Sequence, residues 1–157
     1  MKHNPILILP FAIIFFIACT NSKVKKSNEE SAYIFPKGEK IINENFTGTA
    51  YLEMLVKGDT LNDITVGNVT FAPGARTRWH SHPAGQILLV TDGVGYYQEK
   101  GQAKKILKKG DVVTCLPNVE HWHGASTDSG FVHLAISSNR KGSAKWLSPV
   151  DDVEYKN

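Results

Sequence analysis

The pattern that most constrains this chain is a pair of His-x-His units, His80-x-His82 and His121-x-His123. In an extended strand, alternate side chains point to the same face, so each unit directs two imidazoles to one side of a sheet. A lone histidine on an apolar face is usually a packed structural residue. Here five of the six histidines lie between residues 80 and 133, and four of them form the two same-face pairs. This clustering predicts a metal site.

The composition is that of a globular domain. The 157 residues suffice for one domain with a sizeable core, and 41% of them are hydrophobic while 21% are charged. The net charge is only +3, and the lysines are scattered over turns without a basic stripe or an aromatic platform. We therefore expect no nucleic-acid partner.

Residues 1–18 have the features of an export signal. A short positive start precedes a nearly unbroken apolar run from Ile6 to Ala18, which suits the core of a signal peptide and is short for a membrane span. With Ala18 directly before Cys19, the segment resembles the lipobox of bacterial lipoproteins. The resemblance implies a lipid on Cys19 that anchors the protein in the bacterial cell envelope, with the domain on the periplasmic or extracellular side. A plain signal peptide or a short anchor helix is the alternative.

Residues 19–44 are expected to form a tether followed by an arm. The segment after Cys19 is rich in Asn, Ser, Lys and Glu, which favours a solvated linker. Residues 33–46 mix apolar side chains with Pro36 and Gly38, and we expect them to pack on the edge of the following domain.

Residues 45–157 are predicted to form one all-β domain. Short runs with the character of strands are separated by turn-forming pairs such as Pro73-Gly74 and Asp92-Gly93. Closely spaced strands without a helical period predict an antiparallel sandwich or barrel. A single helical turn also fits residues 150–154.

One face of the predicted strands carries histidines with small or apolar groups, which favours a pocket over a fully packed core. The side chains expected on this face include Gly67, Val69, Phe71, Phe131, His133, Ala135 and Ser137.

Other side chains are expected away from this face. Trp79 and Trp122 should pack between sheets or at a dimer interface, and Arg76 and Arg78 should lie on outer faces without a role. Cys115 has no cysteine partner if Cys19 is lipidated, so we expect a buried, inert thiol.

The chain resembles a small single-domain cupin, because it has counterparts of both sequence boxes of that superfamily. The resemblance implies a jelly-roll barrel, the cupin double-stranded β-helix, with its core at residues 63–138. It also assigns His80, His82, Gln86 and His121 as metal ligands, although most metal cupins have Glu in place of Gln86. The first box is matched by Gly74, His80, His82, Gln86 and Gly93, and the second by Gly110, Pro117 and His121.

Several longer runs, including residues 74–80, 82–86 and 121–125, are similar to the bacterial cupin hydroxynitrile lyases, in a group often associated with carboxymuconolactone decarboxylases. In those enzymes a Gln ligand is normal. The resemblance implies a manganese cofactor, a small-molecule substrate and a homodimer, and it places Thr77, His123 and His133 at the reacting site. The pocket wall of those enzymes corresponds to Gly67, Val69 and Ser137. These groups are small, so they do not indicate which substrate binds.

The expected ligands also suggest a chemistry. Three neutral imidazoles and an amide oxygen leave the divalent charge uncompensated, which suits an anion, an alkoxide or a developing carbanion. Manganese, iron, nickel and zinc all accept such ligands.

His123 and His133 remain outside the ligand set. Histidine exchanges protons near neutral pH, so the two can act as a base and a relay. The alternatives are a residue beside the ligands or on the surface for His123, and a packed core residue for His133. In one continuous strand, Thr77 and His80 would point to opposite faces, so Thr77 reaches the site only if the strand bends after Pro73-Gly74.

The leading hypothesis is a metal-dependent lyase that cleaves a carbon–carbon bond next to a hydroxyl or carbonyl. The cation and Thr77 would hold the hydroxyl and carbonyl oxygen while His123 removes the hydroxyl proton, which releases an aldehyde or ketone and a stabilised carbanion such as cyanide. An Fe(II)-dependent dioxygenase and a non-catalytic envelope module that binds a small molecule or metal are the alternatives.

Overall fold

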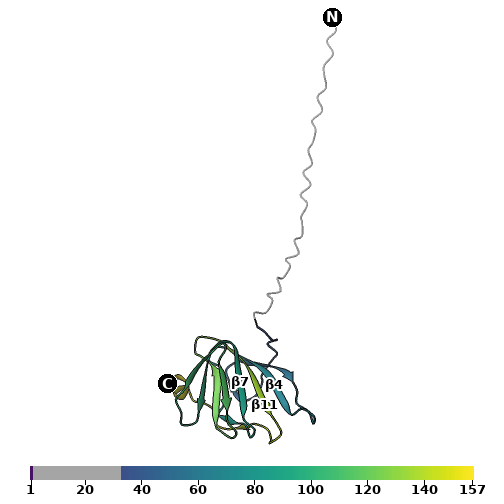
Figure 1. Ribbon diagram of the computed structural model, residues 1–157. Helices are drawn as coiled ribbons and strands as arrows, with labels where there is room; N and C mark the ends of the chain where they lie inside the picture. Colours follow the sequence, from purple (N-terminus) through teal and green to yellow (C-terminus); the bar gives the residue numbers. More distant parts are fainter. Residues whose placement is uncertain (2–32) are drawn as a thin grey trace. The chain divides into compact units, whose positions relative to one another are not determined.

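Antiparallel strands make up almost all of the regular secondary structure in the described chain (Figure 1). The computed structural model describes Met1 and residues 33–157; the predicted signal, Cys19 and the tether lie outside the described residues. The all-β prediction is confirmed, and the helical turn falls at α1. The elements are β1 Glu39–Lys40, β2 Phe46–Thr47, β3 Ala50–Val56, β4 Ile64–Phe71, β5 Arg76–Thr77, β6 His80–Ser81, β7 Gln86–Glu99, β8 Lys105–Lys108, β9 Val112–Cys115, β10 His121–Ala125, β11 Phe131–Ser138, β12 Lys145–Trp146 and α1 Asp152–Lys156.

The long strand β7 joins the two halves of the sheet. Its first part pairs with β9 and β11, whereas its second part pairs with β8 and β10. In Figure 1, β4, β11 and β7 lie side by side, as their pairing requires. The change of partner falls at Gly93, which has a φ of 74°. A Cβ there would stand only 2.0 Å from the carbonyl oxygen of Gly130, so glycine is required at this bend.

The interior between the two halves holds the main core. Cys115 is buried there, as expected, and burial raises the pKa of its thiol to about 11. A thiol with so high a pKa is unreactive at neutral pH. The core is formed by Ala50, Val69, Phe71, Ala75, Leu88, Val90, Tyr97, Leu107, Val113, Cys115, Ala125 and Phe131.

The arm before β2 contacts the outer surface of the sheet. The side-chain amide of Asn68 donates to the carbonyl oxygen of Pro36 at 2.8 Å, and the Lys37 ammonium lies 3.9 Å from the centre of the Tyr51 ring. β1 then pairs with β3. No helix within residues 33–157 has the length and apolar character needed to cross a bilayer.

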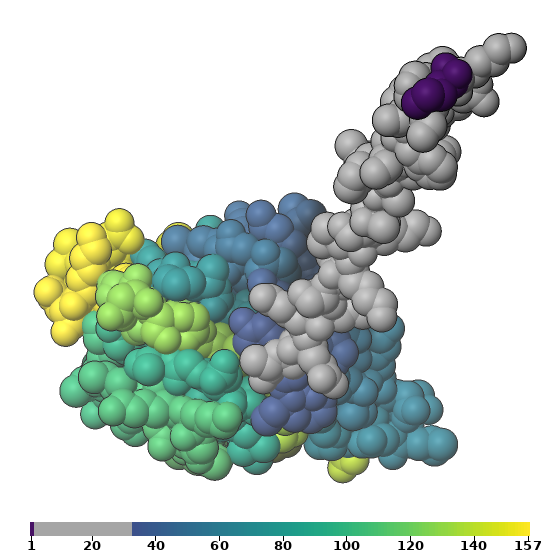
Figure 2. Space-filling view, turned by 90° about the horizontal axis from the view of Figure 1, so that it is seen from above, coloured from purple at the N-terminus to yellow at the C-terminus, as the bar shows by residue number. Residues whose placement is uncertain are grey.

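The C-terminal segment covers a second apolar cluster on the outside of the sheet. Trp79 and Trp122 are almost completely buried there against Val150 and Tyr155. The tryptophans do lie opposite the histidines, but the expected packing between sheets or across a dimer interface is wrong, because the chain's own C-terminus covers them. In Figure 2 the C-terminal residues, in yellow, lie at one edge of the domain.

Arg76 contradicts the prediction of an outer residue without a role, because its side chain is only 6% exposed. Its guanidinium donates to the carbonyl oxygen of Val150 at 3.0 Å and to the Asp152 carboxylate at 2.7 Å. The alternation correctly placed Arg76 outside the barrel, but the C-terminal segment then covers it. Arg78 stays partly exposed, 3.7 Å from the Glu44 carboxylate.

Tyr155→Phe tests how strongly the C-terminal segment is held. The Tyr155 hydroxyl donates to the carbonyl oxygen of Ala125 at 2.8 Å. Without it this buried acceptor is left unpaired, so we expect the free energy of unfolding in urea to fall by about 1–3 kcal/mol. Val153→Ala is the matched control, because Val153 on the same helix is 70% exposed. Equal stabilities for the two variants would contradict this role.

Candidate metal centre

Pairing between β6 and β10 brings the two His-x-His units together. His80 and His121 are direct partners in an antiparallel register, which places their side chains next to each other. Their ring centres are 4.4 Å apart, and the His82 ring lies 5.3 Å from that of His80. One ligand nitrogen from each of the three histidines falls within 4.8 Å of the others. The structure therefore groups three of the four predicted ligands around one point.

Backbone carbonyls orient two of these rings. The Nδ1 atoms of His80 and His121 each lie 2.9 Å from a carbonyl oxygen, those of Arg78 and Val119 respectively. A carbonyl only accepts hydrogen bonds, so in both rings Nδ1 carries the proton and Nε2 keeps a free lone pair. This is the tautomer that a metal-binding histidine needs.

The cluster is neutral. Burial lowers the pKa of His80 well below its usual value and also lowers that of His121. Burial lowers the pKa of His82 to about 4, and its Nε2 atom has no hydrogen-bond partner in the described part of the chain. Neutral imidazoles with free lone pairs are the form that binds a divalent cation.

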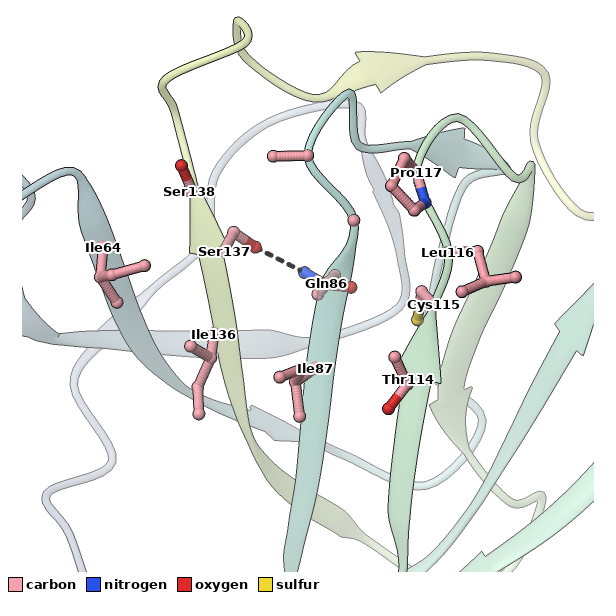
Figure 3. A pocket seen from close by; sticks show the side chains of 12 residues that line it. Ile64, Gln86, Ile87, Thr114, Cys115, Leu116, Pro117, Ile136, Ser137 and Ser138 are labelled. Carbon is pink, nitrogen blue, oxygen red and sulfur yellow. Dashed lines mark hydrogen bonds between the residues drawn. The ribbon is translucent and has the colours of Figure 1, made fainter.

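Gln86 adds an oxygen to this cluster. Its Nε2 atom donates to the Ser137 hydroxyl at 3.3 Å, and Figure 3 shows this bond between β7 and β11. Its Oε1 atom then lies 3.4 Å from Nε2 of His121. Because His121 holds its proton on Nδ1, both atoms of this contact are acceptors. Two acceptors that face each other without a proton suit a shared cation, so the residues present fit the predicted metal.

His123 and His133 form a second pair behind the cluster. Nε2 of His133 and Nδ1 of His123 are 3.2 Å apart, and both rings are buried. Burial lowers both pKa values, that of His133 to about 4. Nε2 of His123 has no hydrogen-bond partner among residues 33–157. His123 lines the cavity described below, whereas His133 lies behind it.

Thr77 reaches the site because the strand is broken. β5 ends at Thr77 and β6 begins at His80, so the two residues do not belong to one continuous strand. The alternation of side chains along a strand therefore does not force them to opposite faces. The bend falls between them, at Trp79, and not after Pro73-Gly74, the place we had considered. The Thr77 hydroxyl oxygen accepts the backbone N–H of His123 at 3.2 Å.

A cavity of about 170 Å³ opens onto these residues. Its wall includes Gly67, Val69 and Ser137, which were predicted from the sequence to line the pocket. The complete lining is Phe46, Leu52, Met54, Thr65, Gly67, Val69, Thr77, His80, His82, Gln86, His123, Ala135, Ser137 and Trp146.

Four apolar residues of this lining were missed in the sequence: Phe46, Leu52, Met54 and Trp146. The spacing of Leu52 and Met54 in one predicted strand could have placed both on the inner face. Trp146 gave no such signal, because it comes from the two-residue strand β12 beside β6. Its ring stacks on that of His80 at a centre-to-centre distance of 4.7 Å.

A curled antiparallel sheet with clustered histidines in its interior defines the class of protein. Residues 67–137 match the family described as Cupin domain. Together with the relative described next, this match shows that the chain belongs to the cupin family.

The chain is 42% identical over 112 residues to the (R)-mandelonitrile lyase of Granulicella tundricola, a match that covers 71% of this chain and 86% of the relative. A crystal structure of a cupin-like protein from Thermotoga maritima is 50% identical, covers 78% of this chain and 94% of its own, and superposes with a TM-score of 0.76. A cupin-2 domain from Rhodospirillum rubrum is 17% identical, covers 75% of this chain and 80% of its own, has a TM-score of 0.62 and supports the fold alone.

His82→Ala tests the metal centre. It removes one of the nitrogen ligands, so we expect the affinity for Mn²⁺ or Zn²⁺ to fall by at least about 100-fold. The increase in melting temperature that a saturating metal gives the wild type should disappear. Ser81→Ala is the control, because alternation along β6 directs Ser81 to the face opposite that of His80. A wild-type melting temperature that responds neither to metal nor to chelator would contradict the site.

Proposed function

We propose that this cupin is a divalent-metal-dependent lyase of the hydroxynitrile lyase type, which splits a cyanohydrin into a carbonyl compound and hydrogen cyanide. The observation that carries the proposal is the free Nε2 atom of His123, which lies beside the neutral ligand cluster in a largely apolar cavity. The similarity to an (R)-mandelonitrile lyase supports it.

In the proposed site, His80, His82, His121 and Gln86 would hold the ion, for which we propose manganese. When bound, a divalent ion supplies a Lewis acid that polarises the substrate oxygen. The four side chains are neutral, so they leave the charge of the ion available to the substrate.

The cavity walls can orient a cyanohydrin. Phe46, Leu52, Met54 and Trp146 offer an apolar surface for the hydrocarbon substituent and keep water away from it. The Thr77 oxygen already accepts one hydrogen bond, from His123, so its own O–H is free to donate to the substrate oxygen. These contacts direct the hydroxyl toward Nε2 of His123.

His123 then moves the proton. Its Nε2 atom takes the hydroxyl proton while the carbon–oxygen double bond forms and the bond to the nitrile carbon breaks, with its electron pair leaving on cyanide. Nε2 of His133 accepts the Nδ1–H of His123, which fixes the tautomer and stabilises the imidazolium. The proton passes from His123 to cyanide, so the products are the carbonyl compound and hydrogen cyanide.

The activity is tested with Mn²⁺-loaded protein and (R)-mandelonitrile, with benzaldehyde measured over time. We expect His123→Gln to lower kcat/KM by about 10²–10⁴-fold, because it cannot act as a base, while the bound metal stays at the wild-type level. Ser129→Ala, in the loop between β10 and β11, should leave the rate unchanged.

Other outcomes would contradict the proposal or favour one of the two alternative functions. Benzaldehyde release no faster than in a metal-free control would contradict the lyase. Iron-dependent oxygen uptake would instead indicate the dioxygenase, and ligand binding without turnover the binding module.

We further propose that the protein forms a homodimer through the face that carries Ile64, Ile87 and Ile136. An apolar groove of about 230 Å³ opens beside them, and Figure 3 shows these three side chains on neighbouring strands along it. None of the described side chains that line this groove is charged. Such a face can meet its own copy across a two-fold axis without repulsion, and exposed aliphatic patches of this kind commonly mark association sites.

Ile87→Lys tests the dimer. The ammonium groups of two copies would be buried in the shared interface, so we expect this variant to sediment as a monomer while the wild type sediments as a dimer under the same conditions. Ile106→Lys is the control, because Ile106 is 62% exposed on β8, away from the groove. A monomeric wild type, or a dimeric Ile87→Lys protein, would overturn the proposal.

A further inference from the structure

A carboxylate lies beside the candidate metal centre without being part of it. Glu99 ends β7, and its backbone is the direct partner of His121 on β10. Tyr97, two residues earlier, points into the core and is fully buried. Glu99 therefore shares the inner face of the strand with Tyr97 and is directed to the end of the barrel where His121 lies.

Tyr97 fixes the position of this carboxylate. Its hydroxyl donates to Oε1 of Glu99 at 2.9 Å, and its ring centre lies 5.6 Å from that of His121. Burial raises the pKa of the Tyr97 hydroxyl, so it remains a neutral donor. A protonated phenol can hold a carboxylate in one orientation, which keeps its charge near His121.

The Glu99 carboxylate lies on the same side of the sheet as the His121 ring. The two residues are direct partners in the antiparallel pairing of β7 with β10, and directly paired side chains point to the same face with their Cβ atoms about 4.5–5.5 Å apart. Glu99 is thus placed to favour positive charge at this end of the histidine cluster.

This matters because every proposed ligand is neutral. A divalent ion among buried neutral groups loses its water without gaining a counter-charge, which weakens binding. A fixed carboxylate close to one ligand offsets part of that cost without occupying a coordination position.

We propose that Glu99 is the counter-charge of the metal centre, acts through space from beside His121 and not as a ligand, and sets the affinity for the ion. Its negative charge acts from a distance, whereas a Glu in place of Gln86 would bring the same charge directly onto the ion. Lys105, whose ammonium lies 5.9 Å from the Tyr97 ring centre, is a surface residue, so solvent screens its opposing charge. The inference rests on the proposed metal site and is independent of the proposed lyase chemistry.

Glu99 also has a simpler structural role, which is to accept the hydrogen bond of the buried Tyr97. Glu99→Gln separates the two roles, because the amide oxygen still accepts from the Tyr97 hydroxyl while the charge is gone. Gln86→Glu combined with Glu99→Gln moves the charge into the ligand set.

The experiment measures Mn²⁺ affinity from the electron paramagnetic resonance signal of free Mn²⁺ in titrations of the full chain. We expect Glu99→Gln to weaken binding by about tenfold, and the double variant to bind at least as tightly as the wild type. Glu120→Gln is the matched control: Glu120 is next to His121 in the sequence but exposed, so its removal should change affinity by less than about twofold. Urea unfolding of the metal-free proteins should give equal stabilities for the wild type and Glu99→Gln.

Two results would contradict the inference, and a third would contradict the metal site as well. If Glu99→Gln binds Mn²⁺ as the wild type does, Glu99 serves only Tyr97 and the inference is wrong. If the double variant remains as weak as Glu99→Gln, the lost affinity does not come from charge, and the inference is again wrong. A wild type that binds neither Mn²⁺ nor Zn²⁺ would overturn the proposed metal site itself, and this inference with it.

Discussion

The direct pairing of His80 with His121 is the contact on which the site depends. β6 has only two residues, and a strand so short has little stability of its own. It is held between β10 on one side and β12 on the other. β12 in turn belongs to the C-terminal segment, which Arg76 and Tyr155 attach to the outside of the sheet. Residues some seventy positions from the first histidine pair thus hold that pair in place.

The site also costs free energy, because it buries four imidazoles in one region and partly buries a fifth, that of His82. The fold reduces this cost by using backbone carbonyls as acceptors for His80 and His121 and by pairing His123 with His133. These bonds leave nitrogen lone pairs pointing at one another or at the cavity. A buried arrangement of this kind is unfavourable unless something positive or protic occupies the space between the lone pairs, which is the physical reason to consider a cation there.

The sequence predicted those parts of the molecule that follow from local alternation. Turn-forming pairs indicated an all-β fold, and the His-x-His spacing indicated that each unit faces one side, as observed. The parts that were missed depend on contacts between distant segments. Arg76 is buried by residues 150–152, and Trp146 reaches His80 through a strand of two residues. No periodicity within a short window encodes either contact.

Thr77 and Glu99 show two further limits. Alternation predicted the wrong phase for Thr77, because it assumes a continuous strand and β5 stops before β6 begins. Glu99 lies on a strand of mixed composition, and its relation to His121 follows only from the register between β7 and β10. A residue whose role is set by register is invisible until the pairing is known.

A neutral ligand, Gln86, and a charged residue outside the ligand set, Glu99, together link metal binding to the proposed chemistry. A carboxylate ligand would bind the ion tightly but would also reduce its pull on a substrate oxygen, because ligand and substrate share the same coordination shell. A carboxylate held by Tyr97 next to His121 acts over a longer distance, so it favours binding of the ion while all four ligand atoms stay neutral. In such a centre the ion would be retained by its surroundings and remain strongly electrophilic toward the cavity. That combination suits a reaction in which negative charge develops on both the substrate oxygen and the leaving group.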